Sequence, residues 1–531
     1  MGRDTISGNA IALDIGTSGI RGQLLDIPSG RILRTSILSR NPLPGSNVMD
    51  HLTFAIDHGA ELARSILLDS VNYIISSLGP KDLRRVSVCG NPIQLSLFEG
   101  IEIRDLAYAG ENKIRNDNII PAERKGHIVP GNTIGLSDNV DVIIPPAIKH
   151  EIGADALAMM LRSGFLDDDM CMVTDYGTNA EMALKIGDRI YTGSAAAGPA
   201  LEGQQMTSGM LAGPGAVSDL ERTPEGWRMK VLDDNLDVKN GPILNMRSNI
   251  VRKQGLAPIG ITGTGVIAVI YAGMADGRME PPKIRRGPVY LGRNISFTEN
   301  DLKEAGKAVG AIRAGHMTLM NEADVRPYDI HTMYMTGASG TYVDAMKAKS
   351  VGIVPSGSKK IIQAGNTSLG LARDMAVRPD MIDELNDLVK KISARHIMFA
   401  SSPVFSSLYI MELAYWTEGM PLHMYRMKLD TMGLGGYLDN DAEAAIDRRC
   451  VRDIPDIGDS LRISEPDVSL KASWECGRCM RCVHSCPEKA LTFADPKFRM
   501  NTGRCLGSAC LRCEEACEKR TFRRSAFGLD V

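Results

Sequence analysis

The sequence predicts an α/β protein with two similar halves, followed by a small cysteine-rich domain. A pattern of strand, Asp-x-Gly-Thr turn, strand, turn and strand occurs at residues 11–38 and again at 171–198. Glycine-rich turns precede apolar helical segments later in the chain, and eight of the 11 cysteines fall within residues 476–517. Repetition of one pattern at a distance indicates an internal duplication.

Length and composition indicate a globular protein of more than one domain. A chain of 531 residues exceeds what one compact core usually supports. The hydrophobic content of 44%, charged content of 24% and formal charge of −3 exclude wholesale disorder and argue against a general nucleic-acid binder. The first residues, MGRDTISGNA, contain neither an apolar signal core nor an Arg-rich amphipathic pattern, so a cytoplasmic location is expected.

The first half begins with three expected strands within residues 11–38. Asp14 ends the first strand and the turn GTSG follows it, which places a carboxylate beside backbone N–H groups able to cradle a phosphate. Apolar periodicity then predicts an amphipathic helix over 61–78 and a further strand over 85–90.

The second half repeats this opening, with Asp175 in the place of Asp14. The turn GITGTG, at 260–265, and a strand–turn–helix at 333–348 place glycines where helices start, a position suited to phosphate binding. The charge-free run 255–275 is about long enough to span a bilayer, but it contains five glycines and a proline. We therefore interpret it as a buried strand, a glycine turn and a core helix, and expect no membrane partner.

The tail contains two cysteine runs, C-x2-C-x2-C-x3-C-P and C-x4-C-x2-C-x3-C. In two-cluster ferredoxins the fourth cysteine of each run ligates the other cluster. The spacing therefore predicts two [4Fe–4S] clusters, one held by Cys476, Cys479, Cys482 and Cys517, the other by Cys505, Cys510, Cys513 and Cys486.

Zinc is the alternative for these cysteines, because short x2 gaps also suit a tetrahedral zinc site. Each run consists of a triplet of cysteines and a separate fourth cysteine, and the first run ends in Cys-Pro. This pattern favours iron–sulfur clusters over zinc. Cys89, Cys171 and Cys450 are isolated in the sequence and are interpreted as inert core thiols. His51 could contact a partner, but a lone histidine is more often structural.

With these motifs the chain resembles a known family. The two Asp-x-Gly-Thr turns and the late TGASG turn resemble the fold shared by actin, sugar kinases and heat-shock chaperone ATPases. Within that fold, SAAAGPALEG at 194–203, GITGTG, MTGASGTYVDA and GNTSLGLA at 365–372 resemble the ATPase domain of reductive activators of corrinoid-dependent enzymes. The resemblance covers roughly residues 9–425. The double-cluster tail resembles the activase of methanogenic archaea for methylamine methyltransferase corrinoid proteins.

This resemblance implies an actin-like (RNase H-type) ATPase domain over 1–465, with duplicated halves at roughly 9–165 and 166–385 and an extension to 465. A ferredoxin-like domain would occupy 466–531. In the resembled fold Asp14 and Asp175 face each other across a cleft and hold Mg²⁺ through water, as hard oxygen ligands suit magnesium. Further contacts to ATP are implied for Gly16, Thr17, Ser18, Gly177, Thr178, Gly337 and Gly340. The alternative is that either aspartate only caps a turn.

The function that the resemblance implies is ATP-dependent reduction of an inactive Co(II) corrinoid to Co(I) on a partner protein. Its implied partners are corrinoid proteins of methyltransferase systems and a low-potential electron donor. Two alternatives stay open: a small-molecule kinase with a redox-sensing tail, and a nucleotide-switched scaffold or iron–sulfur assembly factor for another metalloenzyme. A homodimer is compatible with the sequence but not indicated by it.

Overall fold

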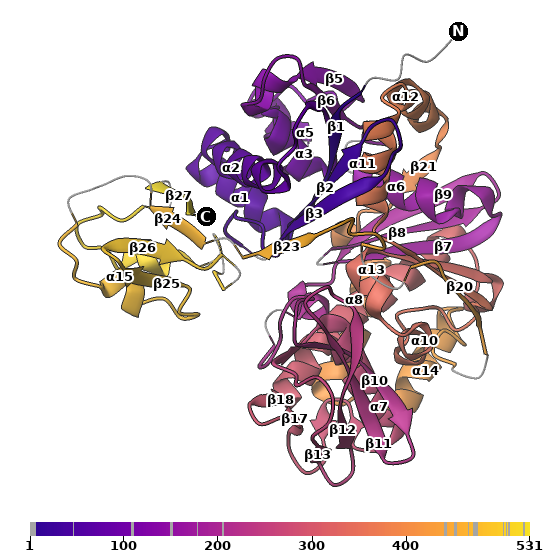
Figure 1. Cartoon of the computed structure of the whole chain (residues 1–531). Coiled ribbons are helices and arrows are strands. Elements are labelled where there is room, and N and C mark those ends of the chain that lie inside the picture. Colours follow the sequence, from indigo (N-terminus) through magenta and orange to yellow (C-terminus); the bar gives the residue numbers. More distant parts are fainter. Residues whose placement is uncertain are drawn as a thin grey trace. The chain divides into compact units, whose positions relative to one another are not determined.

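The computed structural model (Figure 1) divides into two compact units. Unit 1 comprises residues 1–157, 368–392 and 456–531, and unit 2 comprises residues 158–367 and 393–455. The structure describes residues 7–530 with the exception of 46, 108–110, 149–151, 178, 204–205, 440–442, 451–453, 466, 471–475, 503, 506, 508–509 and 524–525. Each unit is built around its own seven-stranded sheet.

The sheet of unit 1 has the strand order β23-β3-β2-β1-β4-β6-β5. Its strands are β1 (Asn9–Ile15), β2 (Ile20–Asp26), β3 (Ile32–Leu38), β4 (Leu83–Gly90), β5 (His127–Pro130), β6 (Asp141–Ile144) and β23 (Leu461–Ser464). Strands β1, β2 and β3 form an antiparallel meander, and β4 runs parallel to β1. β1 is almost wholly buried, as a central strand covered on both faces should be.

Unit 1 also contains several helices. They are α1 (Val48–His58), α2 (Ala60–Leu78), α3 (Pro92–Glu99), α4 (Arg104–Ala107), α5 (Glu111–Asn116) and α12 (Met381–Lys391), while α6 (Ala154–Ser163) and α11 (Thr367–Val377) each cross a unit boundary. α2 buries an apolar stripe at helical spacing against β2 and β3. α3 begins where Asn91 Oδ1 accepts the Gln94 N–H, with Pro92 in its first turn.

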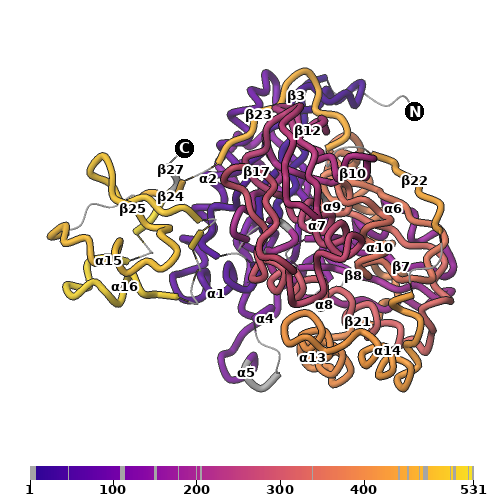
Figure 2. The backbone as a smooth tube through the Cα atoms, turned by 90° about the horizontal axis from the view of Figure 1, so that it is seen from below, coloured from indigo at the N-terminus to yellow at the C-terminus, as the bar shows by residue number. Residues whose placement is uncertain are grey.

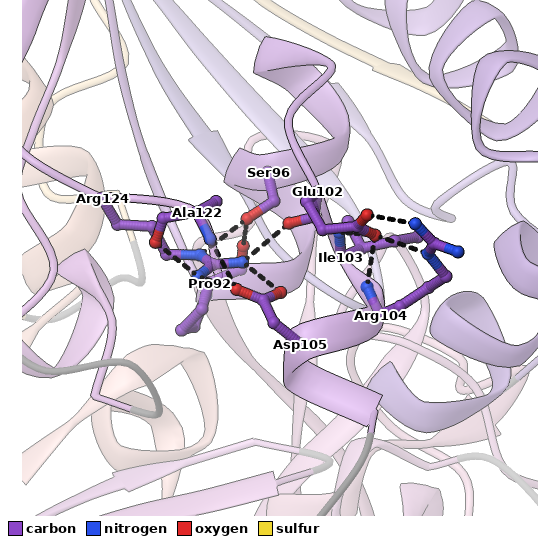
Figure 3. Close-up of polar contacts among 8 residues, drawn as sticks. All are labelled: Pro92, Ser96, Glu102, Ile103, Arg104, Asp105, Ala122 and Arg124. Carbon is purple, nitrogen blue, oxygen red and sulfur yellow. Dashed lines mark hydrogen bonds and ion pairs between the residues drawn. The ribbon is translucent and has the colours of Figure 1, made fainter. Parts of the chain in front are cut away.

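A buried ion pair fixes the segment that follows α3 (Figure 3). The Arg124 guanidinium donates to both oxygens of Asp105, at 2.9 and 3.0 Å, and the Asp105 side chain is fully buried. Arg124 also donates to the Ser96 hydroxyl of α3 and to the Glu102 carbonyl. Because each charge is met by several hydrogen bonds, the pair holds α3 and α4 in one position.

The tail forms a small antiparallel sheet of order β25-β26-β24-β27 within unit 1, drawn in yellow in Figure 1. Its elements are β24 (Asp467–Leu470), β25 (Leu491–Ala494), β26 (Lys497–Met500), β27 (Phe527–Asp530) and the short helices α15 (Arg481–His484) and α16 (Arg512–Glu515). Phe498, Phe522 and Phe527 form a core of its own with several of the cysteines. β27 lies beside α2, as Figure 2 shows.

The sheet of unit 2 has the order β21-β9-β8-β7-β19-β20-β22. Its strands are β7 (Met170–Tyr176), β8 (Asn179–Ile186), β9 (Arg189–Ala196), β19 (Thr332–Thr336), β20 (Lys360–Gly365), β21 (Ala394–His396) and β22 (Ala445–Arg448). Strands β7, β8 and β9 again form an antiparallel meander, and β19 runs parallel to β7. Both large sheets thus place their first strand at the same position in the order.

Unit 2 carries further small sheets and a second set of helices. The strands are β10 (Ala216–Thr223), β11 (Gly226–Leu232), β12 (Val238–Asn245), β13 (Ile250–Arg252), β14 (Gly260–Ile261), β15 (Met279–Glu280), β16 (Lys283–Ile284), β17 (Val289–Gly292) and β18 (Ile295–Phe297). The helices are α7 (Gly263–Ala275), α8 (Glu299–Ala323), α9 (Gly337–Tyr342), α10 (Ala345–Val351), α13 (Pro403–Glu418) and α14 (Leu422–Thr431). α8 starts with a Thr298–Asp301 capping box and packs against α13.

The structure confirms the elements expected from periodicity. The predicted strands of 11–38, 85–90 and 171–198 correspond to β1–β4 and β7–β9, and the helix over 61–78 is α2. The run 255–275 forms β14, a turn and the buried helix α7. Among the described helices, none combines the length and apolar character needed to cross a membrane. The boundaries 9–165, 166–385, 1–465 and 466–531 stay predictions.

Candidate functional site

The turn between β1 and β2 in unit 1 brings Asp14 beside a tight loop. Asp14 is 7% exposed, and its carboxylate lies 3.7 Å from the Arg21 guanidinium on β2. The Gly16 N–H donates to the Gly19 carbonyl at 3.0 Å, which closes the loop over Thr17 and Ser18. The Asn91 amide donates to the Thr17 hydroxyl at 3.1 Å. The loop is therefore held from the start of α3.

A second carboxylate, Asp155, lies near Asp14, and sequence reasoning missed it. Burial raises the pKa of the Asp155 carboxyl to about 6, the Ala156 N–H lowers it, and the negative charge of Asp14 raises it. Burial also raises the pKa of the Cys89 thiol on β4 well above its usual value, with further contributions from the charges of Asp155 and Asp14. Two neighbouring carboxylates at one end of a sheet suit a divalent cation.

In unit 2, Asp175 is the penultimate residue of β7, and Gly177 follows the strand directly. The Thr336 hydroxyl at the end of β19 donates to the Asp175 carboxylate at 2.8 Å. Parallel pairing of β7 and β19 places Asp175 opposite Thr336, which explains this contact. Thr178 lies outside the described residues. Since Asp14 belongs to unit 1 and Asp175 to unit 2, their expected meeting across a cleft stays a prediction.

At the later glycine-rich turns, close packing explains why the residues are glycines. A Cβ atom on Gly337 would lie 2.5 Å from Asp175 Oδ1, and Gly337 has a φ of +79°. A side chain there would displace the carboxylate and strain the backbone. Gly340 is buried against β19. At the start of α7, Cβ atoms on Gly263 and Gly265 would lie 1.7 and 2.2 Å from the carbonyl oxygens of Leu201 and Val217, so these glycines allow close packing.

In the tail, Cys486 from the first run lines a pocket together with Cys505, Cys510 and Cys513 from the second. Pro487, Ala490, Leu491 and Met500 line the same pocket. The four thiols are those that the spacing groups for one cluster, and their apolar surroundings limit access of water.

The other four cysteines also lie near the contact between the two runs. α15 packs against α16, and an ion pair joins Arg481, next to Cys482, to Glu518, next to Cys517. Burial raises the pKa of the Cys482 thiol to about 11, the Val483 N–H lowers it, and the thiolates of Cys476, Cys513 and Cys479 raise it further. The swapped grouping predicted from the cysteine spacing requires such a contact between the two runs.

Backbone N–H groups point at cysteine sulfurs in both runs. The Ala490 N–H lies 3.2 Å from Cys486 Sγ, the Phe522 N–H lies 3.3 Å from Cys517 Sγ, and the Arg478 N–H lies 3.4 Å from Cys476 Sγ. Burial raises the pKa of the Cys517 thiol, but its hydrogen bonds outweigh this effect and lower the net value. Such bonds stabilise a thiolate and adjust the potential of an attached cluster.

The two runs share an unusual backbone. Met480 and Leu511 stand two residues before Cys482 and Cys513, with φ of 59° and 31°. Lys489 and Arg520 stand three residues after the fourth cysteine of each run, and both have a φ of 51°. Non-glycine residues rarely adopt this conformation, and it is found where a site constrains the chain.

Together these features fit iron–sulfur ligation by the tail cysteines. Among the described residues, no three Cys, His, Asp or Glu side chains converge closely enough to hold a single metal ion. Cys89, Cys171 and Cys450 are buried and lie outside this module, which confirms that they are core thiols.

Comparison with known proteins shows which families and proteins this chain is similar to. Residues 9–168 match a family described as the RACo middle region, and residues 169–426 match one described as the C-terminal domain of RACo, the ASKHA domain. A [Co(II) methylated amine-specific corrinoid protein] reductase of Methanosarcina barkeri is 44% identical over 94% of this chain and 95% of its own. The corrinoid activation enzyme RamQ of Eubacterium limosum is 25% identical over 76% of this chain and 70% of its own.

A solved structure of a reductive activator for a corrinoid, iron–sulfur protein is similar with a TM-score of 0.64 and 23% identity, over 79% of this chain and 68% of that chain. At this identity the similarity shows the fold alone. The fold is thus of the actin-like, ASKHA type with mixed α/β sheets.

Proposed function

The chain belongs to the family of reductive activators of corrinoid proteins, and from this premise we propose that it reduces the Co(II) corrinoid of a partner protein to Co(I) in an ATP-dependent reaction. We further propose corrinoid proteins of methylamine methyltransferases as the partners, because the Methanosarcina barkeri relative is named for methylated amine-specific corrinoid proteins. A low-potential donor would supply the electron.

In this proposal Asp14 and Asp175 hold Mg²⁺ through water, and Asp155 assists Asp14. The backbone of residues 16–19, with Thr17 and Ser18, would contact phosphate, as would Gly177 and Thr178, while Gly337 and Gly340 would pass close to the nucleotide. The support in unit 1 is the proximity of Asp14 to Asp155 beside a closed loop. We also propose that the two large sheets represent duplicated halves, since their strand orders correspond.

The tail cysteines would hold two [4Fe–4S] clusters in the swapped grouping predicted above. When bound, these clusters supply one-electron transfer between the donor and the corrinoid of the partner. The observation that carries the proposal is the pocket in which Cys486 joins Cys505, Cys510 and Cys513 within a chain of the ASKHA fold. A nucleotide site and a redox site on one chain are what an energy-driven reductase requires.

ATP is needed because reduction of the corrinoid is expected to be uphill. Each deficit of about 59 mV in a one-electron potential costs about a factor of ten in the equilibrium constant. Nucleotide binding can offset this deficit only by favouring a state of the complex in which the Co(II) corrinoid is more easily reduced.

The test is anaerobic reconstitution of the full-length chain with a corrinoid protein of a methylamine methyltransferase system and a strong chemical reductant. Optical absorption then follows Co(I) with and without Mg-ATP. We expect Co(I) to accumulate only when the chain and Mg-ATP are both present. Equal Co(I) formation without ATP would overturn the proposal, and a chain that binds ATP without producing Co(I) would favour the scaffold alternative.

A further inference from the structure

A chain of hydrogen bonds within unit 1 connects the loop after Asp14 to the second cysteine run, and Asn41 lies at its centre. Asn41 follows β3 and is 4% exposed. Its N–H donates to the Ser18 carbonyl at 2.8 Å, and its side-chain amide donates to the Gly16 carbonyl at 2.9 Å. Asn41 therefore forms hydrogen bonds to two peptide groups of the proposed phosphate loop.

These carbonyls are mechanically tied to the groups that would face a phosphate. A peptide unit is planar, so the Gly16 carbonyl moves with the Thr17 N–H, and the Ser18 carbonyl moves with the Gly19 N–H. If a phosphate draws these N–H groups toward itself, both planes turn. Both hydrogen bonds to Asn41 then change.

On its other side Asn41 contacts the tail. The Thr502 hydroxyl donates to the Asn41 carbonyl at 3.2 Å across 461 residues of sequence, and Thr502 is 2% exposed. Thr502 stands three residues before Cys505, whose N–H donates to the Asn501 carbonyl at 3.2 Å. The contact therefore reaches the turn that positions the first cysteine of the second run.

On the side of α3, Asn41 contacts a rigid support. Its amide lies 3.3 Å from Gln94 Oε1 on α3, and the Gln94 amide lies 2.7 Å from His51 Nδ1. Gln94 and His51 are fully buried, and the Arg124–Asp105 pair anchors α3. With α3 fixed, a displacement of the loop is passed to Thr502 instead of being absorbed elsewhere.

We propose that Asn41 and Thr502 are positioning residues that couple occupancy of the loop at residues 16–19 to the geometry around Cys505. The proposal rests on the nucleotide and cluster sites proposed above and adds the connection between them. Hydrogen bonds in such a buried chain polarise one another, so breaking one link weakens the connection.

The experiment compares full-length variants that differ in one link. Thr502→Val removes the hydroxyl and keeps the shape, while Thr502→Ser restores the hydroxyl. Thr492→Val makes the same change at an exposed threonine of β25 and serves as the matched control. Each reconstituted, dithionite-reduced protein is examined by electron paramagnetic resonance with and without Mg²⁺ and the non-hydrolysable analogue AMP-PNP. Amide hydrogen exchange of segment 497–505 is measured under the same conditions.

We expect AMP-PNP to shift the resonance spectrum and slow exchange of 497–505 in the wild type, in Thr502→Ser and in Thr492→Val. Thr502→Val should lose both responses while it keeps its iron content and its affinity for AMP-PNP. If Thr502→Val loses iron, the variant Asn41→Asp tests the coupling instead. It leaves the tail unchanged and sets a carboxylate oxygen against the Gly16 carbonyl, so it should also lose both responses.

Three results would overturn the coupling. They are unchanged responses in Thr502→Val, unchanged responses in Asn41→Asp, or a wild type that binds AMP-PNP and shows neither response. If such a wild type still produces Co(I) with ATP, the proposed function stands and only the coupling fails. If the wild type binds no AMP-PNP or holds no iron, both proposals fall.

Discussion

Asp14 and Asp175 illustrate how one motif acquires two environments. Each aspartate ends the first strand of a seven-stranded sheet. Asp14 lies near Arg21 and Asp155, whereas Asp175 accepts a hydrogen bond from Thr336 and is approached by Gly337. The two carboxylates therefore differ in local charge, and their substitution need not have equal effects.

We expect Asp14→Asn and Asp175→Asn each to lower Mg-dependent ATP hydrolysis by about 10- to 100-fold, as for residues that orient a metal through water. Iron content should not change, because neither aspartate is among the cysteine ligands proposed for the clusters. Steady-state hydrolysis at varied Mg²⁺ concentration measures the effect. Asp188→Asn, at an exposed turn aspartate, is the control. Hydrolysis at wild-type rates in both variants would leave the aspartates as turn caps.

His51 gives the stability of the protein a defined pH dependence. Burial lowers its pKa from 6.5 to about 4, while the carbonyls of Gly45 and Leu43 raise it less strongly. Unfolded chains bind a proton at His51 below pH 6.5 and folded chains do not, so stability is lost as the pH falls. The contribution is about 2 kcal/mol between pH 7.5 and 5.

Urea unfolding followed by circular dichroism across this pH range should therefore show a smaller pH dependence in His51→Asn than in the wild type. The quantity compared is the slope of the free energy of unfolding against pH, because the substitution also changes packing by an amount that does not depend on pH. His423→Asn, at an exposed position of α14, should retain the wild-type slope. Identical slopes in His51→Asn and the wild type would contradict the burial argument.

At the scale of elements, the two cysteine runs share one local structure. It consists of a short helix, α15 or α16, and the turns on either side of it. In each copy a left-handed residue precedes a short helix that carries the third cysteine, and a later N–H points at the fourth cysteine. We expect this geometry to turn the fourth cysteine away from its own run. In the first run it turns Cys486 toward the pocket lined by the second.

Cys486→Ser should therefore damage the same cluster as Cys510→Ser and spare the one damaged by Cys479→Ser. About half of the iron should be lost in each single variant. The electron paramagnetic resonance spectrum of the remaining cluster should be the same in Cys486→Ser and in Cys510→Ser. The double variant should lose no more iron than either single variant. A Cys486→Ser spectrum that matches Cys479→Ser would refute the swapped grouping. Cys450→Ser, at a core thiol, is the control.

At the scale of the whole molecule, β23 is the last strand of the large sheet of unit 1 before the cysteine-rich tail. This strand pairs with β3 over Leu461–Ser464, and β24 of the tail sheet begins at Asp467. The sheet of unit 1 is therefore complete before the cysteine module begins. Its edge strand is also the connection to that module.

A chain that ends at residue 465 should fold, bind nucleotide and associate with the corrinoid partner, but it should not reduce it. Retention of β23 keeps the edge of the sheet paired, which removal of a further ten residues would expose. Co-elution with the partner, ATP binding and optical absorption of Co(I) are the three measurements. Co(I) formation by the truncated chain would show that the tail is not needed for electron transfer.

The amino-acid sequence by itself determined the features that contiguous residues encode. Period-2 and period-3.6 patterns predicted β1–β4, α2 and β7–β9, and cysteine spacing grouped Cys486 with Cys505, Cys510 and Cys513. The Asp-x-Gly-Thr turns marked the ends of β1 and β7. These features depend on short-range geometry, so a few residues suffice to specify them.

Only the tertiary structure decided which distant residues meet. The position of Asp155 near Asp14 and that of Gly337 against Asp175 depend on how strands are ordered and helices pack. The hydrogen bond from Thr502 to Asn41 joins residues 461 positions apart, and neither residue belongs to a motif. A buried polar group forms a hydrogen bond with a group that the folded chain places near it, and no local sequence pattern specifies that partner.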